Sequence, residues 1–193
     1  ANTVRTPTPF PRNMNPSTSR TLLATVVKAL AEQPISLLKT ADKCYVKMHH
    51  MTIRTEILKK HHIHIDEHCF YVDMEYIFYP MPFVETIAFL PEFLYQYQIG
   101  RQGQSMDPAK MQRNAAQYDH VLESIYAYYD AYCRDIEQAN KKKYIDRLIS
   151  RFYASRIKIL LSMQDAKNRK NELIAMEHAL KQTYPEIYAA NIN

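Results

Sequence analysis

Apolar residues recur at helical spacing through most of the second half of the chain. Residues 109–133, 141–163 and 166–183 each show this pattern with few helix-breaking residues. Asp107 followed by Pro108 is typical of a helix start, with the aspartate as cap and the proline at the first helical position. Pro185 is expected to mark the end of the last segment. The sequence therefore predicts a helical C-terminal extension over residues 108–193, built from about three long helices.

The N-terminal part has a different character. Residues 1–20 contain four prolines among threonine, serine and asparagine, which predicts an extended entry segment. A helix with an apolar stripe is expected from about residue 18 to residue 33, before Pro34. Residues 1–34 therefore form one unit, a proline-rich entry segment and one helix.

Residues 35–107 contain short patterns typical of helices beside short patterns typical of strands. Together with the long helices that follow, they predict an α+β, mostly helical fold for the chain. An extended piece is expected at 43–53 and a short helix at 55–61. The stretches 86–90 and 93–99 are rich in β-branched and aromatic residues, and they predict a strand pair. The aromatic stretch from residue 70 to residue 79 fits either a helix or a strand.

Composition excludes several classes of protein. Two glycines in 193 residues favour helices over tight hairpins. The three cysteines lack a Cys-x-x-Cys spacing, which argues against a disulfide framework or a zinc ribbon and indicates a reducing compartment such as the cytoplasm. No apolar run is long enough to span a membrane. P-loop, dinucleotide-binding and serine-hydrolase motifs are absent.

One carboxylate, Asp73, lies in a strongly aromatic segment. The neighbouring rings are expected to exclude water from it, which would raise the pKa of its carboxyl and suit it to accept a proton near neutral pH. Asp73 is therefore a candidate general base, and the structural alternative is a helix cap or a surface acid. The neighbouring rings are Phe70, Tyr71, Tyr76 and Phe78.

Both glycines of the chain, Gly100 and Gly103, lie in a short polar turn with Arg101. Glycine lets the backbone approach a ligand closely, and the planar guanidinium suits phosphate or carboxylate. A ligand-binding turn and a plain strand-to-helix turn are both open interpretations. Glu75 could orient Asp73, pair with Arg101 or form a structural salt bridge.

Four of the eight histidines occur between residues 61 and 68. In an extended segment His62, His64, Asp66 and His68 point to one side, and such a set suits zinc or another transition metal. Alternate residues of a strand are ~7 Å apart, however, which is too far for all four to share one ion. A solvated polar edge is the preferred interpretation, no metal ligand is assigned, and a metal-binding protein is the alternative.

The net charge of +5 comes from one helical region. Residues 141–170 contain ten basic and two acidic side chains, whereas residues 109–137 contain three basic and five acidic ones. A basic amphipathic helix can lie on an anionic membrane surface, or it can pack its apolar stripe on a core and expose its basic face. Nucleic acid is not predicted, because the basic residues follow no binding signature. The apolar stripe consists of Ile145, Leu148, Ile149, Phe152 and Leu160.

Three segments stand in a characteristic order: 71–76 (Tyr-Val-Asp-Met-Glu-Tyr), 94–97 (Leu-Tyr-Gln-Tyr) and 100–105 (Gly-Arg-Gln-Gly-Gln-Ser). This order resembles the acceptor half of bacterial family 2 glycosyltransferases, which have a GT-A fold and build capsular, exopolysaccharide or wall-linked sugars. Arg113-Asn114 and Asp119-His120-Val121 fit the same resemblance, which covers roughly residues 40–130.

The resemblance implies a sugar transfer from a nucleotide sugar to a polysaccharide or lipid-linked acceptor, with inversion. Asp73 would be the general base, and Glu75 is the alternative, because Val72 stands where many relatives have an acidic partner. The family's loop near the donor diphosphate matches the turn at 101–105. The implied substrate contacts are Tyr97, Arg101, Gln102, Gln104 and Ser105.

One departure from the family decides how the chain is interpreted. The Asp-x-Asp motif that holds Mg²⁺ or Mn²⁺ in the family does not occur here. The chain is therefore expected to be the C-terminal, acceptor-side part (35–107) of a longer cytoplasmic enzyme, carrying the helical extension 108–193 and inactive alone. Residues 141–170 would place it at the inner face of the plasma membrane. The main rival hypothesis is a non-catalytic helical docking module at a membrane surface.

Overall fold

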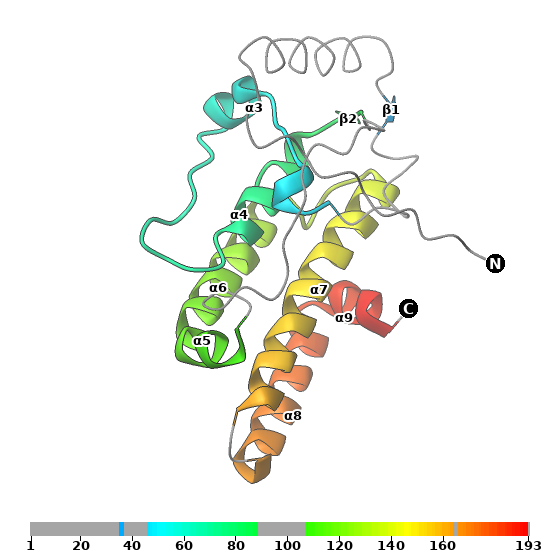
Figure 1. The fold of residues 1–193 in the computed structure, drawn as a ribbon. Coiled ribbons are helices and arrows are strands. Elements are labelled where there is room, and N and C mark those ends of the chain that lie inside the picture. Colours follow the sequence, from blue (N-terminus) through cyan, green and yellow to red (C-terminus); the bar gives the residue numbers. More distant parts are fainter. Residues whose placement is uncertain (1–34, 37–45, 89–106, 164–165, 193) are drawn as a thin grey trace, which may run out of the picture.

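The computed structural model describes residues 35–36, 46–88, 107–163 and 166–192 (Figure 1). These ranges contain seven α-helices, two 3₁₀ helices and one sheet of two very short strands, which confirms a mostly helical protein. The α-helices are α3 (Thr55–Lys60), α4 (Asp73–Phe78), α5 (Pro108–Arg113), α6 (Ala115–Tyr132), α7 (Ala139–Ser162), α8 (Ala166–Thr183) and α9 (Pro185–Ile192). The remaining elements are β1 (Ile35–Ser36), β2 (Thr86–Ile87), η1 (Met48–His50) and η2 (Met81–Phe83).

Helix α7 is the centre of the C-terminal bundle. Helices α5, α6, α8 and α9 all contact it, and Figure 1 shows α8 running back along α7 while α9 folds onto its middle. Helix α4 packs on both α6 and α7, which attaches the region around Asp73 to the bundle. The three long helices expected from the sequence are confirmed as α6, α7 and α8.

The core forms where the apolar stripes of α4, α6 and α7 meet. All five residues of the stripe predicted for the basic helix are buried. Removing such side chains from water is the main favourable term in folding, at roughly 25 cal/mol per Å² of apolar surface. Helix α8 adds the buried Leu180 to this core, and helix α9 adds the buried Ile187. The stripes of α4 and α6 contribute Met74, Ile77, Phe78, Tyr118, Val121, Leu122, Ile125 and Tyr129.

Two of the predicted helix ends are found in the structure, and one break within a predicted helix was not expected. The Asp107 carboxylate accepts hydrogen bonds from the N–H groups of Ala109 and Lys110, as expected of a cap. The predicted single helix over 109–133 is interrupted at Asn114, which separates α5 from α6. The helix predicted over 166–183 ends before Pro185 as expected, since α8 runs from Ala166 to Thr183, but Pro185 begins a further helix, α9, that the sequence did not predict. Proline is tolerated at a first helical position, where its missing N–H would have no partner in the helix.

The predicted strands are the least accurate part of the sequence interpretation. Residues 46–53 contain η1 instead of the expected extended piece. Strand β2 lies in the predicted 86–90 stretch, but its partner is β1, with Ile87 opposite Ile35 in an antiparallel pair. The other predicted strand, 93–99, and the helix at 18–33 lie outside the described residues. No α/β domain occurs in the described ranges.

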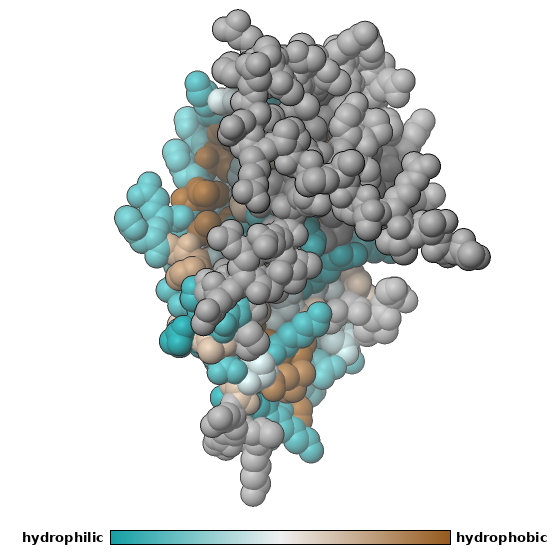
Figure 2. All heavy atoms as spheres, in the orientation of Figure 1, coloured by the Kyte–Doolittle hydropathy of each residue, from teal (hydrophilic) through white to brown (hydrophobic). Residues whose placement is uncertain are grey.

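The surface is mixed in polarity. Figure 2 shows hydrophilic side chains around smaller apolar areas on one face of the molecule. In the part of the chain that the structure describes, no helix is long and apolar enough to cross a membrane. Among the described residues, the exposed large apolar side chains are Met48, Ile65, Phe70, Tyr132, Leu161 and Ile174.

Candidate functional site

Asp73 is the first residue of α4, and its side chain is on the exposed side of that short helix. Surrounding protein still removes part of the water from its carboxyl, and this desolvation raises the pKa of Asp73. Backbone hydrogen bonds and the charge of His49 act in the opposite direction but do not cancel it. The sequence predicted that four neighbouring rings exclude water from Asp73. Two of them do not surround it, because Phe78 is buried in the core and Phe70 is itself exposed.

The deeply buried carboxylate is Glu75, which has an exposed fraction of 0%. Its Oε2 accepts a hydrogen bond of 2.8 Å from the backbone N–H of Asp66, and its Oε1 accepts one of 3.0 Å from the Tyr79 hydroxyl. Burial raises the pKa of Glu75, and these two hydrogen bonds oppose that shift. Both oxygens of Glu75 therefore have partners inside the protein, whereas Asp73 faces the surface.

Replacing Glu75 by Gln should remove a pH dependence of stability. The pKa of Glu75 is higher in the folded protein than its ordinary value of 4.5. Its contribution to the free energy of unfolding is therefore fully present below pH 4.5 and is lost as the pH rises through the folded pKa. The difference in unfolding free energy, wild type minus Glu75→Gln, should grow when urea unfolding is measured at falling pH. A difference that shrinks on acidification would mean that folding lowers this pKa.

The loop from Asp66 to Val72, which leads into Asp73, is attached to helix α6. The Phe70 N–H donates a hydrogen bond of 2.7 Å to the side-chain oxygen of Gln117, and His120 Nε2 lies 2.9 Å from Asp66 Oδ2. The ring of Tyr71 packs edge-on against Tyr118, with centroids 4.9 Å apart. One face of α6 thus sets the position of the loop.

Tyr71 itself has a left-handed backbone, with φ of 72°. This conformation costs a bulky residue of order 1–3 kcal/mol, and such strain persists only where the surrounding structure holds it. The contacts with α6 supply that support. The strained residue stands two positions before Asp73, so the same contacts also determine where the Asp73 carboxylate is presented.

The sequence did not reveal these supporting residues. Gln117 and Tyr118 are separated from the loop by more than forty positions, and no periodicity in a single sequence connects them to it. His120 and Asp119 were noted only through the family resemblance. Asp119 instead pairs with Arg156 of α7, whose Nη2 donates a hydrogen bond of 2.8 Å to its carboxylate.

The second half of the predicted site lies outside the described residues. This applies to the glycine-containing turn at 100–105, and hence to the predicted pairing of Glu75 with Arg101. The geometry of Asp73 relative to these side chains stays a prediction. The residues concerned are Tyr97, Arg101, Gln102, Gln104 and Ser105.

The histidine segment is not an extended strand. His62 and His68 have positive φ values of 48° and 55°, which turn the chain, so the predicted alternation of these side chains along one side of an extended segment does not form. Asp66 instead faces His120 of α6. Within the described ranges, no group of three histidine, cysteine, aspartate or glutamate side chains is placed to hold a metal ion.

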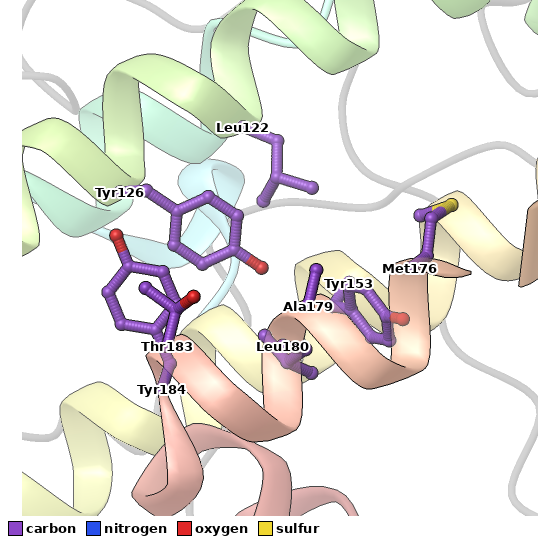
Figure 3. A pocket seen from close by; sticks show the side chains of 8 residues that line it. All are labelled: Leu122, Tyr126, Tyr153, Met176, Ala179, Leu180, Thr183 and Tyr184. Atoms are coloured by element: carbon purple, nitrogen blue, oxygen red, sulfur yellow. The ribbon is translucent and has the colours of Figure 1, made fainter. Parts of the chain in front are cut away.

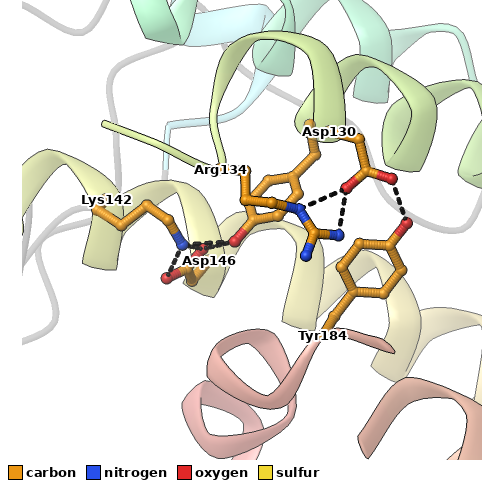
Figure 4. Close-up of polar contacts among 6 residues, drawn as sticks. Asp130, Arg134, Lys142, Asp146 and Tyr184 are labelled. Atoms are coloured by element: carbon orange, nitrogen blue, oxygen red, sulfur yellow. Dashed lines mark hydrogen bonds and ion pairs between the residues drawn. The ribbon is translucent and has the colours of Figure 1, made fainter. Parts of the chain in front are cut away.

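Several basic side chains of residues 141–170 are engaged inside the protein. Lys141 is buried, and it donates a hydrogen bond to the carbonyl of Pro82. Lys142 forms an ion pair of 2.7 Å with Asp146 (Figure 4), and Arg156 is buried against Asp119. Part of the basic region therefore stabilises the bundle. Lys158 and Lys170 are exposed.

In comparisons with protein-family models, curated proteins and solved structures, nothing matches this chain. The chemistry must therefore be inferred from the residues and their geometry. A carboxylate at the surface with a raised pKa can accept a proton from a bound hydroxyl. Of the two acids, only Asp73 is placed to do so, because Glu75 is enclosed by protein.

Proposed function

We propose that this chain is the acceptor-side part of a glycosyltransferase and that Asp73 is its general base. The observation that carries the proposal is the opposite placement of the two acids in α4. Asp73 is exposed at the start of the helix with a raised pKa, whereas Glu75 is buried and hydrogen-bonded to Asp66 and Tyr79. This division favours Asp73 over Glu75 as the base. We include in this proposal that residues 35–107 form the acceptor half of a GT-A domain.

In the proposed reaction Asp73 accepts the proton of an acceptor hydroxyl as its oxygen attacks the anomeric carbon of a nucleotide sugar. The new glycosidic bond forms as the bond to the nucleoside diphosphate breaks, which inverts the anomeric centre. The diphosphate leaves with the electron pair of that bond. Such a base is typically worth 10²–10⁴-fold in rate. The acceptor is a saccharide or a lipid-linked saccharide.

The Mg²⁺ or Mn²⁺ that this family uses would assist departure of the diphosphate. The described residues offer no cluster suited to such an ion, and the sequence has no Asp-x-Asp motif. The metal ligands and the nucleotide-binding half would therefore belong to a longer polypeptide. The residues of this chain would bind the acceptor and move its proton.

The test is release of nucleoside diphosphate from a panel of sugar nucleotides. The long polypeptide that the proposal requires is assayed with saccharide and lipid-linked acceptors, with and without Mn²⁺, in parallel with the 193-residue chain. We expect metal-dependent release by the long polypeptide and none by this chain alone. No release from any donor and acceptor pair, by a folded protein, would contradict the proposal and favour the docking module.

A docking role at a membrane surface has one observation in its favour. Lys158 is exposed near the C-terminal end of α7, and Lys170 is exposed near the N-terminal end of α8. Leu161, which lies between them in sequence, is 65% exposed. Exposed apolar and cationic side chains together suit the surface of an anionic membrane. This role is compatible with the glycosyltransferase proposal, because a lipid-linked acceptor lies at such a surface.

Replacing Lys158 and Lys170 by glutamate should weaken binding to anionic vesicles. Each lysine near an anionic surface is worth about 1 kcal/mol, so the loss of two lowers the affinity roughly 30-fold, and the repulsion of the two new glutamates makes this a lower limit. Co-sedimentation with phosphatidylserine vesicles measures the change. The matched control is Lys59→Glu with Lys60→Glu on α3, which alters the net charge equally at another exposed site. If both double variants bind the vesicles equally well, Lys158 and Lys170 are exposed to solvent without a specific role in membrane binding.

A further inference from the structure

A hollow of about 200 Å³ lies among helices α6, α7 and α8, in the part of the bundle that does not include Asp73. Figure 3 shows Leu122 and Tyr126 of α6 extending toward Ala179 and Leu180 of α8. Met176 closes the wall on the α8 side. The lining is therefore almost wholly apolar and aromatic, which is the usual character of a small-molecule site.

Two tyrosine hydroxyls in this lining lack a hydrogen-bond partner. The hydroxyl oxygens of Tyr126 and Tyr153 are both buried and unsatisfied, and Tyr153 has an exposed fraction of only 5%. A buried polar group without a partner costs about 1–3 kcal/mol. Burial raises the pKa of both phenols, so at neutral pH each keeps its proton and can donate.

Other tyrosines of the bundle show that partners are normally provided. The Tyr118 hydroxyl donates to the carbonyl of Phe152 at 2.7 Å. The Tyr184 hydroxyl, at the edge of the same hollow, donates to Asp130 at 2.9 Å (Figure 4). Buried donors without a partner also occur at the Tyr71 hydroxyl and at Arg156 Nη1, but only those of Tyr126 and Tyr153 belong to residues that line the hollow, where a bound molecule could supply an acceptor.

We propose that this hollow binds a small, uncharged molecule with a ring-sized apolar body and a hydrogen-bond acceptor, such as an aryl ketone. A cavity of about 150 Å³ holds benzene in another protein, so this volume suits one ring with a short substituent. Charge is disfavoured, because the lining has no counter-ion to compensate for the loss of hydration. Small side-chain shifts, which are common on binding, bring the acceptor to the two hydroxyls.

Acetophenone and ethylbenzene are the test pair, because they share a ring and differ mainly in the carbonyl oxygen. Affinities of the 193-residue chain for both are measured by ligand-observed NMR titration. A single hydrogen bond contributes about 0.5–1.5 kcal/mol, so acetophenone should bind roughly 2- to 10-fold more tightly per bond formed. Tyr153→Phe should reduce this preference, and the double variant Tyr126→Phe with Tyr153→Phe should abolish it without weakening ethylbenzene binding.

Two further variants locate the site. Ala179→Leu fills the hollow from α8 and should abolish binding of both compounds. Tyr132→Phe removes a hydroxyl from a residue of α6 that is 53% exposed and outside the lining, and it should leave both affinities unchanged. The proposal is overturned if neither compound binds, if both bind equally to the wild type, or if the ketone preference survives in the double variant. Thermal unfolding confirms that each variant folds.

Discussion

Replacing Asp73 by Asn is expected to lower the turnover of the proposed glycosyltransferase by at least ~100-fold while the fold stays intact. Asparagine has nearly the same shape as aspartate but cannot accept a proton at neutral pH. Because Asp73 is exposed at the first position of α4, its substitution removes no core contact. The expected loss is therefore chemical and should appear in kcat. Steady-state release of nucleoside diphosphate by the long polypeptide measures it.

A matched control is available in the preceding loop. Glu67 is another exposed acid, and Glu67→Gln makes the same chemical change away from α4. It should leave turnover within about twofold of the wild type, because surface substitutions of this kind usually have small effects. Equal turnover in Asp73→Asn and the wild type would remove Asp73 from the role of base. Thermal unfolding of both variants separates a catalytic defect from a folding defect.

Replacing Glu75 by Leu is expected to lower the free energy of unfolding by about 3 kcal/mol. The substitution introduces an apolar side chain of similar size and removes both acceptor oxygens. The N–H of Asp66 and the hydroxyl of Tyr79 then stay inside the protein without partners. Each group of this kind costs about 1–3 kcal/mol when left unsatisfied. Urea unfolding of the 193-residue chain, followed by far-ultraviolet circular dichroism, measures the loss.

The control for this prediction is Glu67→Leu, which places the same side chain at an exposed position. It should change the free energy of unfolding by no more than about 0.5 kcal/mol. A Glu75→Leu variant as stable as the wild type would mean that the two donors find other partners, and that Glu75 does not hold the loop to α4. The two predictions assign opposite characters to neighbouring acids: Asp73 affects turnover with little effect on stability, and Glu75 affects stability first.

Helical spacing explains why two acids two residues apart have such different surroundings. Successive residues of an α-helix are about 100° apart around its axis, so residues 73 and 75 face nearly opposite sides. In a strand they would lie on the same side. The sequence allowed either element for this segment, and the choice between them decides which acid is enclosed. Closeness in sequence therefore did not tell which rings lie near Asp73 in space: Phe78 is buried in the core, whereas burial and, to a lesser degree, the charge of Asp73 raise the pKa of the Tyr71 phenol.

The long helices could be predicted because each carries enough information within itself. Apolar stripes in α6, α7 and α8 recur at helical spacing over many residues, and Asp107 supplies a local cap to α5. The strand pairing could not be predicted in the same way. Strand β2 pairs with β1 through only two residues on each side, about fifty positions apart in the sequence, and no local pattern specifies such a partner.

The sequence by itself determined the helical class of the protein, the positions of its long helices and the apolar face of α7, because helix periodicity and capping act over short distances. It also suggested Asp73 as a candidate base, through the aromatic segment around it and the resemblance of the segment order to a glycosyltransferase, and that assignment stays a prediction. Only the tertiary structure decided which acid is buried, that α6 supports the strained turn at Tyr71, and that Lys141 and Arg156 serve the core. Burial and partners depend on contacts between residues distant in the chain, and these form only when the helices pack together.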